Sequence, residues 1–253
     1  MSRIVLITGA TAGIGRAIAY QFAANDFRVI ITGRRLDRLE EIKADLVDKF
    51  NAEVLALNFD IRNSIEVNKA IESLPQDWKA IDILVNNAGL AVGLNKIHEG
   101  LLDDWERMID TNVKGLLYIT KAVSPLMVER CKGHIINIGS IAGKETYPNG
   151  NVYCATKHAV DALSKSMRID LVDFGIKVTQ IAPGAVETEF SNVRFKGDDA
   201  RAEKVYEGFE PLRAEDIADA VYYCASLPDH VNINDLVIMP TAQAAASVIV
   251  RKP

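Results

Sequence analysis

The sequence predicts a single α/β domain, built on a doubly wound parallel sheet of about seven strands with helices on both faces. Three observations predict this fold. Short apolar runs alternate with amphipathic helical segments along most of the 253 residues. The apolar runs consist mainly of Val, Ile and Leu, as expected for strands that are covered on both faces. No internal repeat or linker interrupts the alternation, so we treat residues 1–253 as one domain.

The predicted strands are short apolar runs, and the first two end at a glycine. The strands are expected at residues 4–8, 28–32, 53–58, 81–85, 134–138, 177–182 and 236–239. Because helices separate them, successive strands are joined by crossover connections and run parallel.

The predicted helices carry apolar residues three and four positions apart. In the first helix, Ile14, Ile18 and Phe22 share one face. Asn63 followed by Glu66 resembles an N-cap pair and opens the third helix. The helices are expected at residues 14–25, 36–50, about 63–74, about 104–131, 151–174 and 214–226.

Composition and charge exclude several classes of protein. The net charge is −5, from 29 Lys and Arg against 34 Asp and Glu, which argues against a nucleic-acid or membrane partner. No apolar stretch approaches the ~18 residues of a membrane span, and the N-terminal apolar run is too short for a signal peptide. The three cysteines and four histidines show no metal-ligand spacing. We therefore expect a cytoplasmic protein without a metal site.

A glycine-rich turn joins the first strand to the first helix. Gly9 permits a tight turn, Gly13 lets the backbone approach a pyrophosphate, and Gly15 lets the helix pack on the sheet. Phosphates would lie at the helix N-terminus, where free N–H groups favour anions. The alternative is a glycine-rich turn without a ligand, but its place between strand and helix favours a dinucleotide site. That site comprises Thr8, Gly9, Thr11, Gly13, Ile14 and Gly15.

Two arginines follow the second strand, where a dinucleotide-binding unit usually carries an acid for the ribose 2′-hydroxyl. Arg34 and Arg35 occupy this position, and a guanidinium can hold a 2′-phosphate with a planar fork of donors. The pair therefore predicts NADP as the cofactor. The alternative is a solvated basic turn.

A tyrosine and a lysine four residues apart form the predicted catalytic pair. Tyr153 and Lys157 share one helix face, and a nearby ammonium lowers the pKa of a phenol. Tyr153 can then protonate an alkoxide or deprotonate an alcohol. Ser140 follows a strand and would bind the reacting oxygen at the carboxyl edge of the sheet.

Together these residues resemble the short-chain dehydrogenase/reductase family across nearly the whole chain. The matching pieces occur in family order and spacing: residues 8–15, Asp60, residues 86–89, Asn112, Ser140, Tyr153, Lys157, Pro183, Gly184 and Thr188. The resemblance implies a Rossmann-type fold and an NADP-dependent oxidoreductase that acts on CH–OH groups. It also implies a proton relay from Asn112 through Lys157, and adenine contacts from Asp60 and Ile61. Further implied cofactor contacts are Asn87, Ala88, Gly89, Pro183, Gly184, Val186 and Thr188.

A subgroup resemblance narrows the substrate. Residues 33–35, 86–90, 137–140, 189–198 and 230–234 resemble NADP-dependent 3-hydroxy acid dehydrogenases, which act on serine, allo-threonine and related small hydroxy acids. The hypothesis is therefore a small hydroxy acid or carbonyl substrate. The alternatives are a broad NADPH-dependent carbonyl reductase for ketones or aldehydes, and an NADP(H)-binding regulator without turnover.

The polar segment 187–213 is expected to form an irregular substrate loop. Arg194 and Lys196 bracket Phe195 there, and a guanidinium could bind a substrate carboxylate while the ring closes over it. Otherwise both cations are solvated or face a partner, and backbone N–H groups or Asn151 must bind the carboxylate. The family resemblance also implies a homotetramer, built from the two long helices and the apolar segment 242–250.

Overall fold

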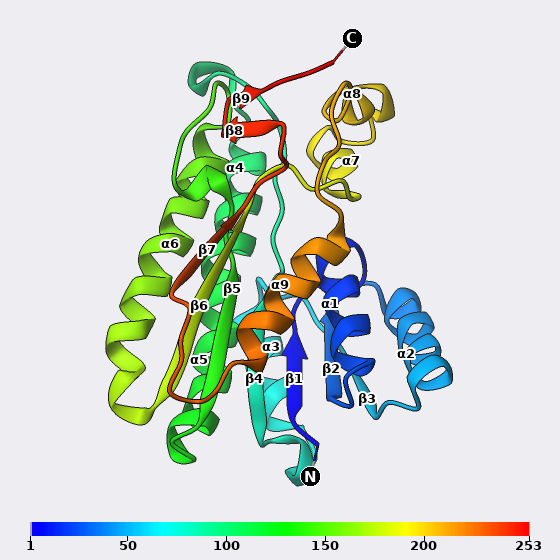
Figure 1. The fold of residues 1–253 in the computed structure, drawn as a ribbon, viewed down its shortest axis with the longest axis vertical. Helices are drawn as coiled ribbons and strands as arrows, with labels where there is room; N and C mark the ends of the chain where they lie inside the picture. Colours follow the sequence, from blue (N-terminus) through cyan, green and yellow to red (C-terminus); the bar gives the residue numbers. More distant parts are fainter. Residues whose placement is uncertain (1, 253) are drawn as a thin grey trace.

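A computed structural model describes residues 2–252 of the chain (Figure 1). Its main sheet has seven parallel strands in the order β3-β2-β1-β4-β5-β6-β7. The strands are β1 Ile4–Ile7, β2 Arg28–Gly33, β3 Val54–Asn58, β4 Ile81–Asn86, β5 Gly133–Ile138, β6 Ile176–Pro183 and β7 Asp235–Ile238. The strand order reverses between β1 and β4, so ligands are expected in the crevice at the carboxyl ends of these strands. The predicted fold class is confirmed.

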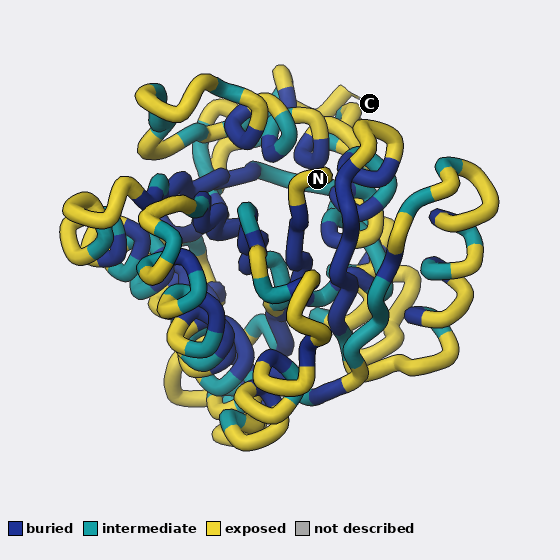
Figure 2. Tube along the Cα trace, turned by 90° about the horizontal axis from the view of Figure 1, so that it is seen from below, coloured by how far each residue is buried: buried dark blue, intermediate teal, exposed yellow. Residues whose placement is uncertain are grey.

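Helices cover both faces of the sheet. The bounds are α1 Gly13–Ala23, α2 Leu36–Phe50, α3 Ser64–Glu72, α4 Leu102–Ile109, α5 Leu116–Glu129, α6 Asn151–Leu171, α7 Phe190–Arg194, α8 Asp199–Lys204 and α9 Ala214–Ser226. Helices α1, α2 and α9 pack on one face, and α3, α5 and α6 pack on the other. Seen from below, the strands form a buried band between helices whose outer sides are exposed (Figure 2).

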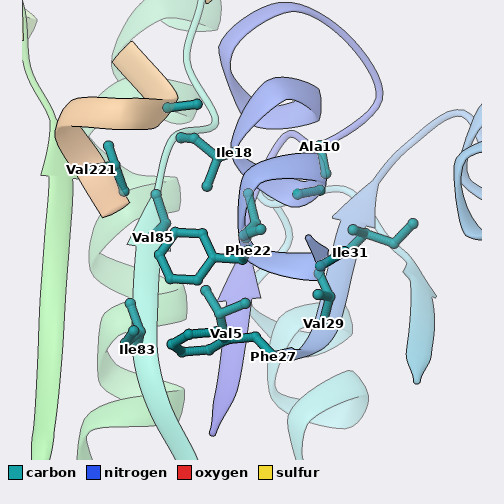
Figure 3. Packing of buried hydrophobic residues seen from close by; sticks show 14 of the residues in the cluster. Val5, Ala10, Ile18, Phe22, Phe27, Val29, Ile31, Ile83, Val85 and Val221 are labelled. Carbon is teal, nitrogen blue, oxygen red and sulfur yellow. The ribbon is translucent and has the colours of Figure 1, made fainter. Parts of the chain in front are cut away.

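The alternation of side chains along each strand divides the core into two clusters. Val5 and Ile7 of β1 face one cluster, whereas Ile4 and Leu6 face the other. Figure 3 shows the first cluster, in which Phe22 of α1 meets strand residues including Val85 of β4. Apolar residues on both faces of every central strand thus fix the register that brings the strand ends to one edge.

The predicted helix over residues 104–131 differs from the observed one in its middle. Helix α4 begins at Leu102, and a π-helical turn at Asp110–Gly115 separates it from α5. Asn112 lies in this turn, where its side chain bonds to the chain at Leu90. A π-turn adds one residue to a helical turn and often marks a functional position. The spacing of apolar residues in the sequence does not reveal such a turn.

Segment 187–213 is more regular than the sequence indicates. Short helices α7 and α8 occupy it, and in Figure 1 they lie beyond the end of the sheet toward which β1 points. The apolar segment 242–250 forms a separate antiparallel hairpin of β8 Gln243–Ala245 and β9 Val248–Ile249. Within residues 2–252, every helix is too short or too polar to span a bilayer.

Candidate active site

One cavity runs along the carboxyl edge of the sheet and collects most of the predicted site residues. It extends from the end of β2 across the β1–β4 switch point to the start of α6. Its lining includes the following predicted residues: Gly9, Thr11, Gly13, Ile14, Arg34, Arg35, Asp60, Ile61, Asn87, Ala88, Gly89, Ser140, Tyr153, Lys157, Pro183, Gly184, Val186 and Thr188. The predicted nucleotide and catalytic groups therefore share one continuous space.

The glycine-rich turn is shaped by close contacts with two other strand ends. Gly9 has a φ of 67°, and a Cβ there would lie 2.9 Å from the Cα of Ala88. The Asn87 amide donates to the carbonyl oxygens of Thr8 and Gly9, at 2.9 and 3.2 Å. A Cβ on Gly13 would lie 3.2 Å from Thr188. The turn is therefore fixed in shape while its backbone stays close to the cavity.

The start of α1 is suited to an anion. Its N-cap is Ala12, whose side chain cannot accept a hydrogen bond from the first helical turn, and the first turn contains no acidic residue. Free N–H groups at such a terminus, together with the helix dipole, favour a phosphate. Gly15, predicted to allow close packing, lies in this turn; a Cβ there would approach the Gly9 carbonyl oxygen to 2.4 Å.

A group of arginines lies at the far end of the cavity, after β2. Arg35 donates from Nε and Nη2 to the Thr11 hydroxyl, at 3.2 and 2.8 Å. Arg34 is more exposed and lies 3.8 Å from the Asp60 carboxylate. Asp60 itself is held mainly by Arg62, at 2.6 Å. Both predicted arginines thus keep side-chain donors at the edge of the cavity.

The catalytic pair lies at the other end of the cavity, on the first two turns of α6. Tyr153 and Lys157 are both buried, and the Lys157 ammonium is 6.0 Å from the centre of the Tyr153 ring. Lys157 donates to the Ile138 carbonyl oxygen at 2.9 Å. Ser140 accepts a hydrogen bond from the N–H of Ala142 at 3.1 Å, which fixes its side chain at the end of β5.

The pKa of Tyr153 corrects one expectation from the sequence. Burial raises the pKa of the phenol above its usual value, and a hydrogen bond with Ser140 and the charge of Arg194 only partly oppose this rise. Burial also lowers the pKa of Lys157 to about 8. The Lys157 charge is not among the causes that lower the pKa of Tyr153, and the desolvation of the phenol outweighs those that are. Tyr153 is therefore neutral at neutral pH, which is the form that donates a proton.

Asn112 reaches the same site from the π-turn. Its amide accepts from the Leu90 N–H and donates to the Leu90 carbonyl oxygen, each at 2.8 Å, and it also donates to the Thr156 hydroxyl at 3.0 Å. A Cβ on Gly89 would lie 3.3 Å from Asn112 Oδ1 and 3.6 Å from Lys157 Nζ. Because Gly89 has no side chain, the Asn112 and Lys157 side chains can both lie close to it.

Segment 187–213 brings an arginine against the catalytic tyrosine. The Arg194 guanidinium lies 5.7 Å from the centre of the Tyr153 ring and donates to the Tyr147 hydroxyl at 2.7 Å. Within residues 2–252, its buried Nε has no hydrogen-bond partner. The Phe190 ring packs edge-on against Tyr153 with centres 5.7 Å apart. Helix α7 thus covers the reactive end of the cavity.

The predicted pairing of Arg194 with Lys196 around Phe195 is wrong. Lys196 turns toward α4 and forms a 2.9 Å ion pair with the buried Asp104, and the Phe195 ring packs under Arg201. The reason is local: α7 ends at Arg194, and Lys196 adopts a left-handed conformation with a φ of 55°. Arg194 alone of the two faces Tyr153.

Sequence reasoning missed two charged residues near the arginines. Arg38 stands three residues after Arg35 and shares its helix face, and Glu189 follows Thr188. The Glu189 carboxylate accepts from Arg38 Nη1 at 2.8 Å and from Arg35 Nη1 at 3.3 Å. The three-residue spacing of Arg35 and Arg38 could have indicated that both arginines lie together. The sequence holds no signal that either arginine pairs with Glu189.

The glycine-rich turn lies where the strand order of the parallel sheet reverses, and it shares one cavity with the buried Ser140, Tyr153 and Lys157. This combination defines a dinucleotide-dependent oxidoreductase. Residues 3–199 match the family model described as short chain dehydrogenase. The chain belongs to this family.

Known relatives match over almost the full length. The chain is 52% identical over 250 residues to the NADP-dependent 3-hydroxy acid dehydrogenase YdfG of Salmonella typhi, covering 98% of this chain and 99% of the relative. It is 45% identical over 245 residues to sulfoacetaldehyde reductase 2 of Chromohalobacter salexigens, covering 96% of each. A solved structure described as the closed form of serine dehydrogenase complexed with NADP+ superposes with a TM-score of 0.92 at 51% identity, covering 99% of this chain and 100% of that one.

Proposed function

We propose that the protein is an NADP-dependent oxidoreductase that transfers a hydride between the nicotinamide and a small 3-hydroxy acid or β-hydroxy amino acid. The observation that carries this function is the single cavity lined at one end by Arg34 and Arg35 and at the other by Ser140, Tyr153 and Lys157. The relatives named as 3-hydroxy acid and serine dehydrogenases support the substrate class.

The residues of the cavity fit NADP. The uncapped first turn of α1 suits the pyrophosphate, and Arg34 and Arg35 suit the 2′-phosphate, which a guanidinium can bind through two parallel N–H groups. Asp60 and Ile61 line the space for the adenine, and Thr188 lines the space between the turn and α7. When bound, the nicotinamide supplies or accepts the hydride.

The side chains of the chain itself handle the proton and the position of the reacting oxygen. Ser140 and Tyr153 offer two hydroxyl groups at one point of the cavity, so both can bond to the same substrate oxygen. Tyr153, neutral at pH 7, donates its proton in the reductive direction, and in the oxidative direction its phenolate form accepts the proton of the substrate hydroxyl. Lys157, held by Ile138, is placed to orient the nicotinamide ribose, and Asn112 stabilises the turn behind it.

Arg194 is the proposed anchor for the substrate carboxylate. It is the cation of segment 187–213 that lies against Tyr153, and its buried Nε retains a free donor among the described residues 2–252. A carboxylate placed there would hold the neighbouring hydroxyl carbon near the phenol. The related sulfoacetaldehyde reductase favours a second candidate function, reduction of a small aldehyde that bears an anionic group. The same arginine would serve both substrates.

A substrate and cofactor panel tests the proposal. Absorbance at the NADPH band should change with serine or 3-hydroxypropionate and NADP, and much less with NAD. An Arg34→Ala/Arg35→Ala variant should lose the preference for NADP, since a charge-assisted phosphate contact contributes about 1.5–3 kcal/mol. Equal use of both cofactors by the unmodified protein would refute the cofactor assignment. Turnover of uncharged ketones alone would favour a broad carbonyl reductase.

The proposed enzyme acts in the cytoplasm as a homotetramer. Its three cysteines are unpaired, as is common in a reducing compartment. Leu117 of α5 and Ile169 of α6 expose apolar side chains that a second subunit could cover. Light scattering at micromolar concentration should give the mass of four chains, and a monomeric mass would contradict this assembly.

A further inference from the structure

A chain of buried polar side chains lies near the carboxyl ends of β4 and β5, on the face of the sheet that α5 and α6 cover. Asn86 ends β4, Thr120 lies in α5, Asn137 lies in β5 and Ser164 lies in α6, and each is 0–7% exposed. The Asn86 amide donates to the Thr120 hydroxyl at 2.9 Å and to the Asn137 side-chain oxygen at 2.8 Å. The Asn137 amide in turn donates to the Ser164 hydroxyl at 2.9 Å. We call these four residues the Asn137 network.

The Asn137 network joins the same two elements that carry the proposed proton-transfer groups. Asn137 directly precedes Ile138, whose carbonyl oxygen accepts from Lys157 at 2.9 Å, and Ser140 follows at the same strand end. Ser164 stands about two helical turns after Lys157, so both side chains lie on one face of α6. The Asn137–Ser164 bond and the Lys157 contact therefore both depend on how α6 lies against β5.

Apolar contacts alone leave the position of α6 loosely defined. Val160 and Met167 pack in the core between α6 and the sheet, and such contacts have no preferred direction. Hydrogen bonds are directional, and the Asn137 amide nitrogen lies 2.9 Å from Ser164 Oγ and 3.7 Å from Met167 Sδ. Ser164 donates its own proton to the Val160 carbonyl oxygen at 2.7 Å, which leaves its oxygen as the acceptor for Asn137. Because Asn86 occupies the Asn137 side-chain oxygen, the amide is held facing α6.

Helix α6 carries this position to the catalytic tyrosine. It contains no glycine or proline from Asn151 to Leu171, so no residue within it favours a bend. Tyr153 lies at its start, whereas Ser140 lies beyond β5 and is fixed there by the Ala142 N–H. The separation of the Tyr153 and Ser140 hydroxyls is therefore set by the contact between α6 and β5.

We propose, on the basis of the proposed function, that Asn137 and Ser164 are positioning residues. Their hydrogen bond sets α6 against β5, so that the hydroxyls of Tyr153 and Ser140 bond to the same substrate oxygen. Without this bond, α6 stays attached through Lys157 and its apolar face, but Tyr153 shifts relative to Ser140. A displacement of about 1 Å can reduce the rate about 10²-fold. The arginines of the proposed 2′-phosphate site follow β2 and not α6 or β5, so the affinity for NADPH persists.

Substitution of Ser164 separates positioning from a merely structural role. Ser164→Ala removes the acceptor of the Asn137 amide. Thr179→Val is the matched control, because it removes a buried hydroxyl that joins β6 to His134 of β5 at 2.8 Å. Both variants should lower the melting temperature, since each leaves a buried polar group unpaired.

Turnover is measured per NADPH-binding site, and the sites are counted by fluorescence titration well below the melting temperature of each variant. Ser164→Ala should lower kcat per site about tenfold to a hundredfold and leave the dissociation constant of NADPH unchanged. Thr179→Val should keep both values, because partial unfolding reduces the number of sites and not the turnover of each site.

A double variant tests the contact itself. Asn137→Ala should also lower kcat per site, and Asn137→Ala/Ser164→Ala should be about as slow as Asn137→Ala alone, because the two side chains act through one bond. Losses that multiply overturn the role of this bond, as does full turnover per site by Ser164→Ala or an equal loss by Thr179→Val. If the unmodified protein binds NADPH but oxidises neither serine nor 3-hydroxypropionate with NADP, the proposed function fails. If it oxidises them and Ser164→Ala does so equally well, only the positioning role fails.

Discussion

The two walls of the active-site cavity are held in place by different kinds of contact. On the sheet side, Asn112 and Lys157 are buried and bond to backbone carbonyl oxygens of Leu90 and Ile138 at 2.8 and 2.9 Å. On the opposite side, segment 187–213 is attached by the ion pairs of Glu189 and Lys196, whose side chains are 52% and 48% exposed.

This difference indicates which part of the site is rigid. Buried hydrogen bonds to the backbone cost the full desolvation of their partners when broken, whereas the exposed ion pairs of Glu189 contribute about 0–1 kcal/mol each. The pair of Lys196 with Asp104 is stronger, because breaking it would leave the buried carboxylate uncompensated. The proton-transfer groups are thus preorganised by the sheet, and the substrate-binding groups sit on an element that is attached at Glu189 by exposed ion pairs, which break at low cost. Changes on the two walls should therefore affect different kinetic constants.

The largest effect is expected on the rigid wall. Tyr153→Phe keeps the ring that packs on Phe190 but removes the proton donor, so kcat should fall by about 10²–10⁴ while NADPH binding persists. Stopped-flow turnover and NADPH fluorescence titration measure the two quantities separately. Tyr222→Phe, in the aromatic cluster with Phe22 and Phe27, is the control for loss of a hydroxyl. Substantial turnover by Tyr153→Phe would disprove its role.

A smaller effect is expected for a substitution in segment 187–213, and it should appear in KM. Arg194→Ala should raise the KM for a hydroxy acid about tenfold to a hundredfold, by loss of a charge-assisted hydrogen bond, with little change for an uncharged alcohol of similar size. Lys196→Ala is the matched variant, because Lys196 pairs with Asp104 rather than facing Tyr153. Its KM should change much less. Equal losses on charged and uncharged substrates would reject Arg194 as the anchor.

A separate effect, on stability and not on catalysis, concerns the sheet under acid. Burial lowers the pKa of His134 in β5 to about 3, from 6.5. Below pH 6.5 the unfolded chain binds a proton that the folded chain does not, so the free energy of unfolding should fall by about 1.4 kcal/mol per pH unit down to about pH 3.

The acid sensitivity can be assigned with one substitution. His134→Gln removes the titration and keeps a donor for the Thr179 hydroxyl, which His134 contacts at 2.8 Å. Urea unfolding at a series of pH values should therefore give a flatter profile for this variant than for the unmodified protein. Parallel profiles would show that other groups cause the loss of stability.

Local patterns in the sequence were sufficient for the sheet and for most of the predicted cavity lining. Val, Ile and Leu runs, the glycine spacing from Gly9 to Gly15 and the four-residue spacing of Tyr153 and Lys157 each express backbone geometry over a few residues. In a parallel sheet the ends of such runs meet at one edge, so the order of the motifs alone predicts a common crevice.

Tertiary structure decided the features that depend on residues far apart in the chain. The π-turn at Asn112 arises where its amide bonds to Leu90, and the ion pair of Glu189 with Arg35 joins residues 154 positions apart in the chain. The pKa of Tyr153 rises rather than falls because desolvation depends on everything packed around the phenol, not on one neighbouring charge. Likewise, Arg194 and Lys196 diverge because α7 ends between them and because the buried Asp104 attracts the lysine.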